Sequence, residues 1–411
     1  MSEAKCSAAL GGWEGYQVGA VERFEVREGR TEPEVWIELQ PVSGRPMLCS
    51  GCREVVGQAH DLSERWVRDL PILGATTWLL MYRARVLCSR CGPKLEHLDW
   101  LARHARVTRR LAESVARRCR VLPVKHVAEF YRLGWDAVKA IDQAHLTESL
   151  GPVDLSGVDV IAMDEFAIQK GHRYATVVVE PSSKRVLWVG RGRGREDVRP
   201  FFELLGPEGC RRLKAVVMDM NSAYDIEARQ HCPQVAIVYD LFHVVAKYGR
   251  EVIDRVRVDE ANRLRQNPQA RQVIKGSRWL LLRNRENIER NADRIRLTEL
   301  LQANRQLMTV YVLKDDLKQL WHYRRPGMAL RFWRQWYGRA IRSRIGPLKA
   351  FARKLRAYLP GILAHCRWPL HTSLLEGINN KIKVIKRMAY GFRDDAYFFL
   401  KIRAAFPGKP G

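Results

Sequence analysis

Three aspartates follow runs of apolar residues that are typical of buried strands. Asp164 follows Val-Ile-Ala-Met, Asp219 follows Ala-Val-Val-Met, and Asp240 follows Ile-Val-Tyr. An ionised carboxylate beside such a run is unfavourable unless it is paired, hydrogen-bonded or bound to a metal ion. If Asp164 and Asp219 end adjacent strands of one sheet, Mg²⁺ between their carboxylates is favoured, because this ion prefers oxygen ligands. The ordinary alternative is that these aspartates begin turns.

A further acid, Glu376, lies in a predicted helix near Ser373–Ala389. Amides and cations follow Glu376 at offsets of three, four, seven and eleven residues: Asn379, Asn380, Lys383 and Arg387. These offsets place the side chains on or close to one helix face, and Lys386 adds another cation. A carboxylate beside amides and cations can hold a metal ion and a phosphodiester together. Alternatively, Glu376 is an ordinary acid at a helix N-terminus.

Four cysteines form two Cys-x-x-Cys pairs separated by 35 residues: Cys49, Cys52, Cys88 and Cys91. Four thiolates with this spacing can surround one Zn²⁺ ion at ~2.3 Å, and they leave no open position for a reactive water. A structural zinc site is therefore expected. The alternatives are an incidental pair or a redox pair, but the second pair and the glycine in or beside each turn argue against both.

A basic segment precedes and enters three predicted helices, Thr108–Cys119, Val124–Tyr131 and Trp135–Leu146. Their lengths and the short turn at Arg132-Leu-Gly suit a helix-turn-helix, whose last helix enters the major groove of DNA. Four side chains are then candidates for DNA contact: Arg109, Arg110, Trp135 and Lys139. Any small three-helix bundle can show similar spacing, so the basic residues are needed to favour the DNA-binding interpretation.

The elements that position the acids alternate between strands and helices. Strands are expected at Val158–Met163, Tyr174–Val179 and Arg185–Val189, followed by helix, strand, helix and strand up to Tyr239. This is the order of a ribonuclease H-like sheet. The segment from Phe242 to Leu359 is almost entirely helical and too long for a loop.

We therefore predict an α/β protein with a ribonuclease H-like core that carries a large α-helical insertion, preceded by a small β-rich zinc-binding domain and a helix-turn-helix. The expected segments are the zinc-binding domain at 1–100, the helix-turn-helix at 101–150, the first part of the core at 151–245, the insertion at 246–360 and the end of the core at 361–411.

The charge of the chain points to a polyanionic partner. Its 411 residues include 71 Lys and Arg against 45 Asp and Glu, for a net charge of +26. Two blocks are especially basic: residues 101–125 hold eight cations and the single acid Glu113, and residues 349–390 hold nine and the single acid Glu376. Nucleic acid fits this pattern better than a membrane surface, because the cations do not form one amphipathic helix. Without an apolar span or signal segment, we expect a cytoplasmic protein.

Four sequence blocks together resemble the catalytic blocks of DDE transposases of the ISL-three family of bacterial insertion sequences. They are Met-Asp-Glu-Phe at 163–166, Val-Met-Asp-Met at 217–220, Tyr-Asp-Leu-Phe-His-Val at 239–244, and the long block from Leu375 to Arg393. The likeness also includes the four-cysteine domain, the helix-turn-helix and the helical insertion. Family resemblance matches Asp164, Asp219 and Glu376 to a metal-binding triad, and Asp240 and His243 to an accessory Asp-x-x-His element.

This resemblance implies a transposase that binds terminal inverted repeats and target DNA, and that cleaves and joins strands with two Mg²⁺ or Mn²⁺ ions. Phosphate contacts are expected from the last predicted helix: Asn379, Asn380, Lys383, Lys386 and Arg387. Joining two transposon ends in one event implies a homodimer or larger assembly on DNA. A nuclease or resolvase without strand transfer, and a DNA-binding regulator without catalysis, are the alternatives.

Overall fold

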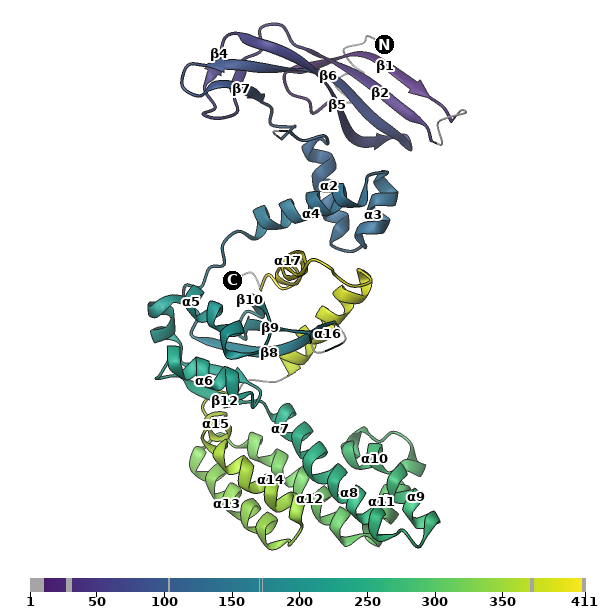
Figure 1. The fold of residues 1–411 in the computed structure, drawn as a ribbon, viewed down its shortest axis with the longest axis vertical. Helices are drawn as coiled ribbons and strands as arrows, with labels where there is room; N and C mark the ends of the chain where they lie inside the picture. Colours follow the sequence, from purple (N-terminus) through teal and green to yellow (C-terminus); the bar gives the residue numbers. More distant parts are fainter. Residues whose placement is uncertain are drawn as a thin grey trace. The chain divides into compact units, whose positions relative to one another are not determined.

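The protein is described from a computed structural model that covers residues 11–26, 32–102, 104–169, 171, 173–369 and 373–408. The chain divides into two compact units (Figure 1). The first comprises residues up to 151 together with 386–392, and the second comprises 152–385 and the residues from 393 onward. Within the described ranges, each helix is too short or too polar to cross a bilayer.

A β-sheet with strand order β1-β2-β6-β7-β3-β4 forms the N-terminal part of the first unit, and β5 pairs with β6 outside this path. Its apolar core includes Ile37, Leu39, Leu79 and Met81, which are almost completely buried. The strands are β1 (Tyr16–Phe24), β2 (Glu34–Pro41), β3 (Met47–Cys49), β4 (Val55–Val56), β5 (Ala59–Ile72), β6 (Ala75–Cys88) and β7 (Gly92–His97).

The longest hairpin of this sheet joins β5 to β6. Leu73 and Gly74 form its two-residue turn with φ angles of 48° and 77°, the left-handed pair that matches the twist of adjoining strands. The apolar pattern of the sequence predicts part of β6 but does not reveal β5. Most side chains in the first half of β5 are exposed, so this half shows no buried, alternating pattern.

A buried carboxylate connects this sheet to the helices that follow. Asp69 of β5 accepts hydrogen bonds from Trp13 Nε1 at 2.9 Å, Thr108 Oγ1 at 2.6 Å and Arg110 Nε at 2.8 Å. The neighbouring Arg68 donates to the backbone carbonyls of Tyr131 and Arg132. Successive residues of one strand thus hold the start of the helical segment and its internal turn.

Three helices complete the first unit: α2 (Arg109–Cys119), α3 (Val124–Tyr131) and α4 (Trp135–Leu150). Leu111, Val115, Val127 and Val138 form their fully buried core. Arg132 ends α3 in the left-handed conformation, with φ of 54°, and α4 begins three residues later. The predicted three-helix arrangement is therefore present.

The second unit contains a five-stranded sheet in the order β10-β9-β8-β11-β12. Strands β8, β9 and β10 form an antiparallel meander, and β11 pairs in parallel with both β8 and β12. The order of strands and helices matches the sequence expectation. The bounds are β8 (Val160–Gln169), β9 (Arg173–Glu180), β10 (Arg185–Arg191), α5 (Arg195–Arg212), β11 (Ala215–Met218), α6 (Ser222–His231) and β12 (Ala236–Tyr239).

Helices follow β12 as far as residue 364. They are α7 (Leu241–Tyr248), η1 (Gly249–Ile253), α8 (Asp254–Arg263), α9 (Pro268–Gly276), α10 (Arg278–Leu282), η2 (Arg285–Asn287), α11 (Asn291–Ala303), α12 (Arg305–Gln319), η3 (Leu320–His322), α13 (Pro326–Arg342), α14 (Gly346–Ala357) and α15 (Leu359–Ala364). Their core is continuous with that of the sheet. Trp321 Nε1, for example, donates to the carbonyl of Tyr239 at 3.4 Å.

Two helices end the chain, α16 (Ser373–Met388) and α17 (Asp395–Ala405). The expectation that the helix near Ser373–Ala389 is the last one is wrong. Asp394 caps α17 by accepting a hydrogen bond from the backbone N–H of Tyr397. Phe398 of α17 is fully buried and packs edge-on against Phe166 of β8. This helix is short and apolar, so its sequence pattern alone does not separate it from a strand.

The ion pair of Asp69 and Arg110 supports a stability prediction. Substitution Arg110→Ala leaves the buried Asp69 carboxylate without its cation, and we expect it to lower the free energy of unfolding of the first unit by roughly 2–4 kcal/mol. Urea unfolding followed by tryptophan fluorescence measures this change. Arg109→Ala is the matched control, because Arg109 is exposed. Equal stability of the two variants would contradict a structural role for Arg110.

Candidate active site and cysteine cluster

The pairing of β8 with β11 brings two of the predicted catalytic acids to one level of the sheet. The last paired residues are Ala162 and Val217, and Asp164 and Asp219 each lie two residues farther along their strands. The sequence suggested that Asp164 ends its strand, but it does not. Strand β8 continues to Gln169 because its other edge remains paired with β9. Asp164 therefore sits where β11 stops and the sheet edge opens.

Asp240 joins these acids from the end of β12. Its carboxylate caps α7 by accepting a hydrogen bond from the Phe242 N–H at 2.6 Å. One turn later, His243 Nε2 lies 3.9 Å from Asp240 Oδ2 and 3.9 Å from Asp164 Oδ1. The Asp-x-x-His spacing thus places one imidazole between two carboxylates, since residues three apart share a helix face.

Burial makes ionisation of this cluster unfavourable. Burial raises the pKa of Asp164 to about 6, aided by the charges of Asp219 and Asp240 and opposed by His243 and the Glu165 N–H. Burial likewise raises the pKa of Asp240 to about 6, and it raises the pKa of Asp219. Desolvation and mutual repulsion both disfavour the charged carboxylates. A bound cation would relieve both effects.

Helix α16 approaches the cluster through an amide. Asn379 Nδ2 donates to Asp164 Oδ2 at 2.7 Å. The Oδ1 atom of Asn379 is buried, and the described part of the chain gives it no hydrogen-bond partner. Glu376, one turn earlier, is exposed, and its charge contributes to the raised pKa of Asp240. The geometry thus places Asn379 within the carboxylate cluster instead of on a surface open to DNA.

The carboxylates share a neighbourhood but do not form a closed ligand set. Among the described residues, only one group of three or more His, Cys, Asp or Glu side chains has all its ligand atoms within 4.8 Å of one another. That group is the four cysteines. The other predicted contacts of α16 point outward to differing degrees. Asn380, Lys383 and Arg387 are exposed, whereas Lys386 is half-buried.

The sequence patterns did not identify two charged residues near Asp219. The charge of Glu165 raises the pKa of Asp219, and the charge of Lys247 lowers it. Glu165 also pairs with Arg193, whose guanidinium is 2.8 Å from Glu165 Oε1 and 4.1 Å from the ring centre of Tyr174. Arg193 belongs to the glycine-rich turn before α5, where Asp197 accepts hydrogen bonds from the backbone N–H groups of residues 193 and 194. These hydrogen bonds cap the N-terminus of α5.

The two Cys-x-x-Cys turns meet in the first unit. The sulfur atoms of Cys49, Cys52, Cys88 and Cys91 lie within 4.8 Å of one another, and the sulfurs of Cys52 and Cys88 are 3.5 Å apart. A side chain at Gly51 would bring its Cβ within 3.0 Å of the Cys91 sulfur, so only glycine fits without a shift. The donor set and its compactness suit a tetrahedral metal site.

The residues predicted to contact DNA in the helix-turn-helix differ in their surroundings. Trp135 is half-exposed at the start of α4, and Lys139 Nζ lies 5.9 Å from its ring centre. Arg109 is exposed at the start of α2. Arg110 is different, because its guanidinium is bound to Asp69 and to the carbonyl of Gly11. The geometry gives Arg110 a structural role, and its contact with DNA stays a prediction.

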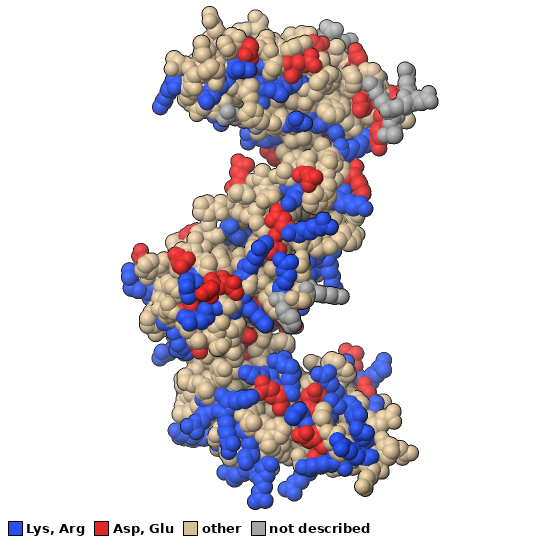
Figure 2. Space-filling model, viewed as in Figure 1, with Lys and Arg blue, Asp and Glu red and all other residues tan. Residues whose placement is uncertain are grey.

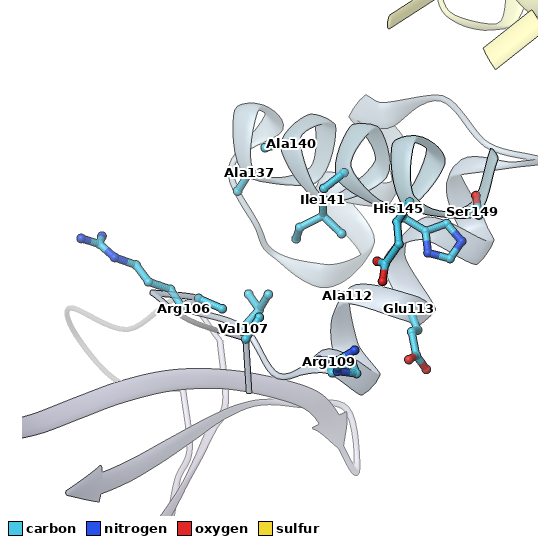
Figure 3. Close-up of a pocket in the computed structure, with 14 residues that line it drawn as sticks. Arg106, Val107, Arg109, Ala112, Glu113, Ala137, Ala140, Ile141, His145 and Ser149 are labelled. Carbon is cyan, nitrogen blue, oxygen red and sulfur yellow. The ribbon is translucent and has the colours of Figure 1, made fainter. Parts of the chain in front are cut away.

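A cavity of about 810 Å³ lies between the start of α2 and one side of α4 (Figure 3). Ala137, Ala140 and Ile141 of α4 face Val107 and Arg109 across it. All of its lining residues fall between 102 and 149, so this hollow does not include the carboxylate cluster.

The raised pKa of Asp240 makes the stability of the metal-free protein pH-dependent. Ionisation opposes folding, because the folded-state pKa of about 6 exceeds the ordinary 3.8, and this unfavourable contribution grows as pH rises between those values. Asp240→Asn keeps a side chain that can cap α7. We expect it to raise the free energy of unfolding of the second unit by roughly 1–3 kcal/mol at pH 8, and to lose most of this gain by pH 4. Chemical unfolding at both pH values tests this, and an equal gain at both contradicts it.

Comparison with known proteins agrees with these features over the length of the chain. A family model described as transposase matches residues 161–402, one for the helix-turn-helix domain of transposase family ISL3 matches 96–146, and one for the zinc-finger of the IS204, IS1001, IS1096 and IS1165 transposases matches 45–91. The transposase for insertion sequence element IS1001 of Bordetella parapertussis is 55% identical, with 99% of each chain covered. The transposase for IS1557 of Mycobacterium tuberculosis is 26% identical, over 90% of this chain and 88% of the relative. The chain therefore belongs to the ISL3 (ISL-three) family of transposases, with a helix-turn-helix domain and a DDE transposase domain.

Proposed function

We propose that Asp164, Asp219 and Glu376 form the catalytic triad of this transposase and hold divalent metal in a ribonuclease H-like core. The observation that carries this proposal is the convergence of buried carboxylates with raised pKa values on the side of β8 that α16 approaches. Like charges in such a position are stable together when a cation lies between them. Oxygen ligands favour Mg²⁺ or Mn²⁺.

The residues around the triad have distinct proposed roles. The amide of Asn379 orients Asp164 by donating to Oδ2, and its Oδ1, which has no partner among the described residues, can accept a hydrogen bond. His243 lies between Asp164 and Asp240 and offsets their repulsion when protonated. When bound, two metal ions supply activation of the attacking water or 3′-hydroxyl and stabilisation of the leaving oxygen at phosphorus.

DNA recognition is proposed for the first unit, whose exposed Trp135 and Arg109 and half-buried Lys139 belong to the helix-turn-helix. By analogy with the named relatives, the DNA is the terminal inverted repeats of an insertion sequence, followed by target DNA. Exposed Asn380, Lys383 and Arg387, with Lys386, are proposed to neutralise phosphates near Glu376. Joining two ends requires at least two copies of the chain, so a homodimer or larger assembly on DNA is proposed.

Single substitutions of the triad separate chemistry from binding. We expect Asp164→Ala, Asp219→Ala and Glu376→Ala each to reduce strand cleavage at least about 10³-fold, because each removes an oxygen ligand. Affinity for terminal-repeat DNA should change less than about threefold. Cleavage and strand transfer are measured with labelled repeat DNA carrying a 3′-hydroxyl. Glu196→Ala is the matched control, since this exposed acid lies on α5. Cleavage retained by a triad variant would remove that residue from the triad, and cleavage without joining would favour a nuclease.

The cysteine cluster is proposed to hold one structural Zn²⁺. We expect purified protein to contain about one zinc per chain, measured by elemental analysis, and Cys88→Ser to lose it because three thiolates bind more weakly than four. The metal-free first unit should unfold at lower urea concentration. Cys119→Ser is the control, because Cys119 is buried in the helical core away from the cluster. Full zinc content in Cys88→Ser would contradict this assignment.

A further inference from the structure

We propose that the exposed cations of α13 and α14 form a surface that binds the sugar–phosphate backbone of duplex DNA without reading its sequence. The proposal rests on the proposed function only in that the partner is DNA. It assigns a role to the helical part of the second unit, residues 246–360, which neither the carboxylates nor the helix-turn-helix requires.

The helical part carries most of the net positive charge of the chain. Residues 246–360 contain 28 Lys and Arg against 10 Asp and Glu, a net +18 of the total +26. The imbalance is greatest from residue 317 to residue 375, where 13 Lys and Arg are accompanied by no Asp or Glu. Figure 2 shows Lys and Arg outnumbering Asp and Glu over the helices that follow α7. A surface of this kind raises the local concentration of a polyanion.

Helix α13 separates its apolar and cationic residues on opposite faces. Ala329, Trp333, Trp336 and Ala340 are buried, and Trp336 Nε1 donates to the carbonyl of Leu313 at 2.8 Å. The tryptophans therefore belong to the core and are not available for stacking on bases. Three exposed arginines lie on the opposite face, at positions consistent with helical spacing: Arg331, Arg334 and Arg342.

Gly338 lies at the centre of this arginine row. It is in the interior of α13, where glycine is less favourable than alanine by about 1 kcal/mol. A Cβ atom there would come within 3.3 Å of both terminal nitrogens of Arg342. The absence of a side chain at Gly338 thus leaves room for the Arg342 guanidinium, which lies over this part of the helix.

Among the described residues, these three arginines have no ion-pair partner. In the part of the chain that the structure describes, no carboxylate lies within 4.0 Å of Arg331, Arg334 or Arg342, whereas Arg339 on the same helix pairs with Asp316. Helix α14 packs beside α13 and adds a second row with spacing of four and three residues, made of the half-buried Lys349 and the exposed Arg353 and Arg356. Two rows of cations that are unpaired among the described residues lie on neighbouring helices. They suit the repeated phosphate charges of a DNA backbone better than they suit a partner with a single acidic residue.

Removing the arginine row tests the proposal. We expect the triple variant Arg331→Gln, Arg334→Gln and Arg342→Gln to bind a long terminal-repeat duplex at least about tenfold more weakly at 0.15 M salt, with a salt-dependence slope smaller by about 2–3. A short duplex that covers only the helix-turn-helix footprint should be bound almost as well as by the wild type. Fluorescence anisotropy with duplexes of both lengths measures this.

The control has the same loss of charge elsewhere in the helical part: Arg263→Gln, Arg296→Gln and Arg305→Gln, all at exposed positions. Equal affinity of the two triple variants for the long duplex overturns the proposal. So does a loss of self-association of the DNA-free arginine-row variant in sedimentation, because the surface would then contact a second copy.

Cleavage at saturating DNA should persist in both variants. Absence of cleavage in the wild type would instead refute the catalytic function and leave the binding result intact.

Discussion

The structure depends on a cluster of like charges that the fold forces together at the edge of a sheet. Parallel pairing of β8 with β11 sets Asp164 level with Asp219, and Asp240 follows from the next parallel strand. Their burial raises all three pKa values. Such a cluster weakens the fold unless a cation joins it, so the same geometry that opposes folding prepares a divalent-metal site.

The surrounding elements limit this repulsion without removing it. His243 lies between two of the carboxylates, the N-terminus of α7 binds Asp240, and the amide of Asn379 binds Asp164. Glu376, the third acid of the proposed triad, is exposed on α16, one turn before Asn379. The buried acids are preorganised, and the exposed acid completes the proposed site.

The sequence predicted the order of elements around the site because apolar strands and amphipathic helices leave clear periodic patterns. It did not predict that β8 extends past Asp164, because that extension depends on pairing with β9. Arg110 and Arg109 look alike in sequence, but only the fold shows that Asp69 binds the former. The role of Asn379 is also visible only in the fold. Its spacing from Glu376 predicts its helix face but not its contact with Asp164.

Charge is divided between two tasks in this chain. Cations dominate its total, and residues 246–360, which contain no part of the carboxylate cluster, contribute +18 of the net +26. Few acids are buried, and the proposed chemistry depends on them. Affinity and cleavage should therefore respond to different residues and to different conditions, with salt acting on the first and divalent metal on the second.

Metal-specificity exchange at Asp219 tests the account most directly. A thiolate is a poorer ligand for Mg²⁺ than for Mn²⁺, which accepts softer donors. We predict that Asp219→Cys shows no detectable cleavage of terminal-repeat DNA with Mg²⁺ but recovers measurable cleavage with Mn²⁺. Full activity with Mg²⁺, or no recovery with Mn²⁺ in a variant that still binds DNA, would contradict a role for Asp219 as a metal ligand.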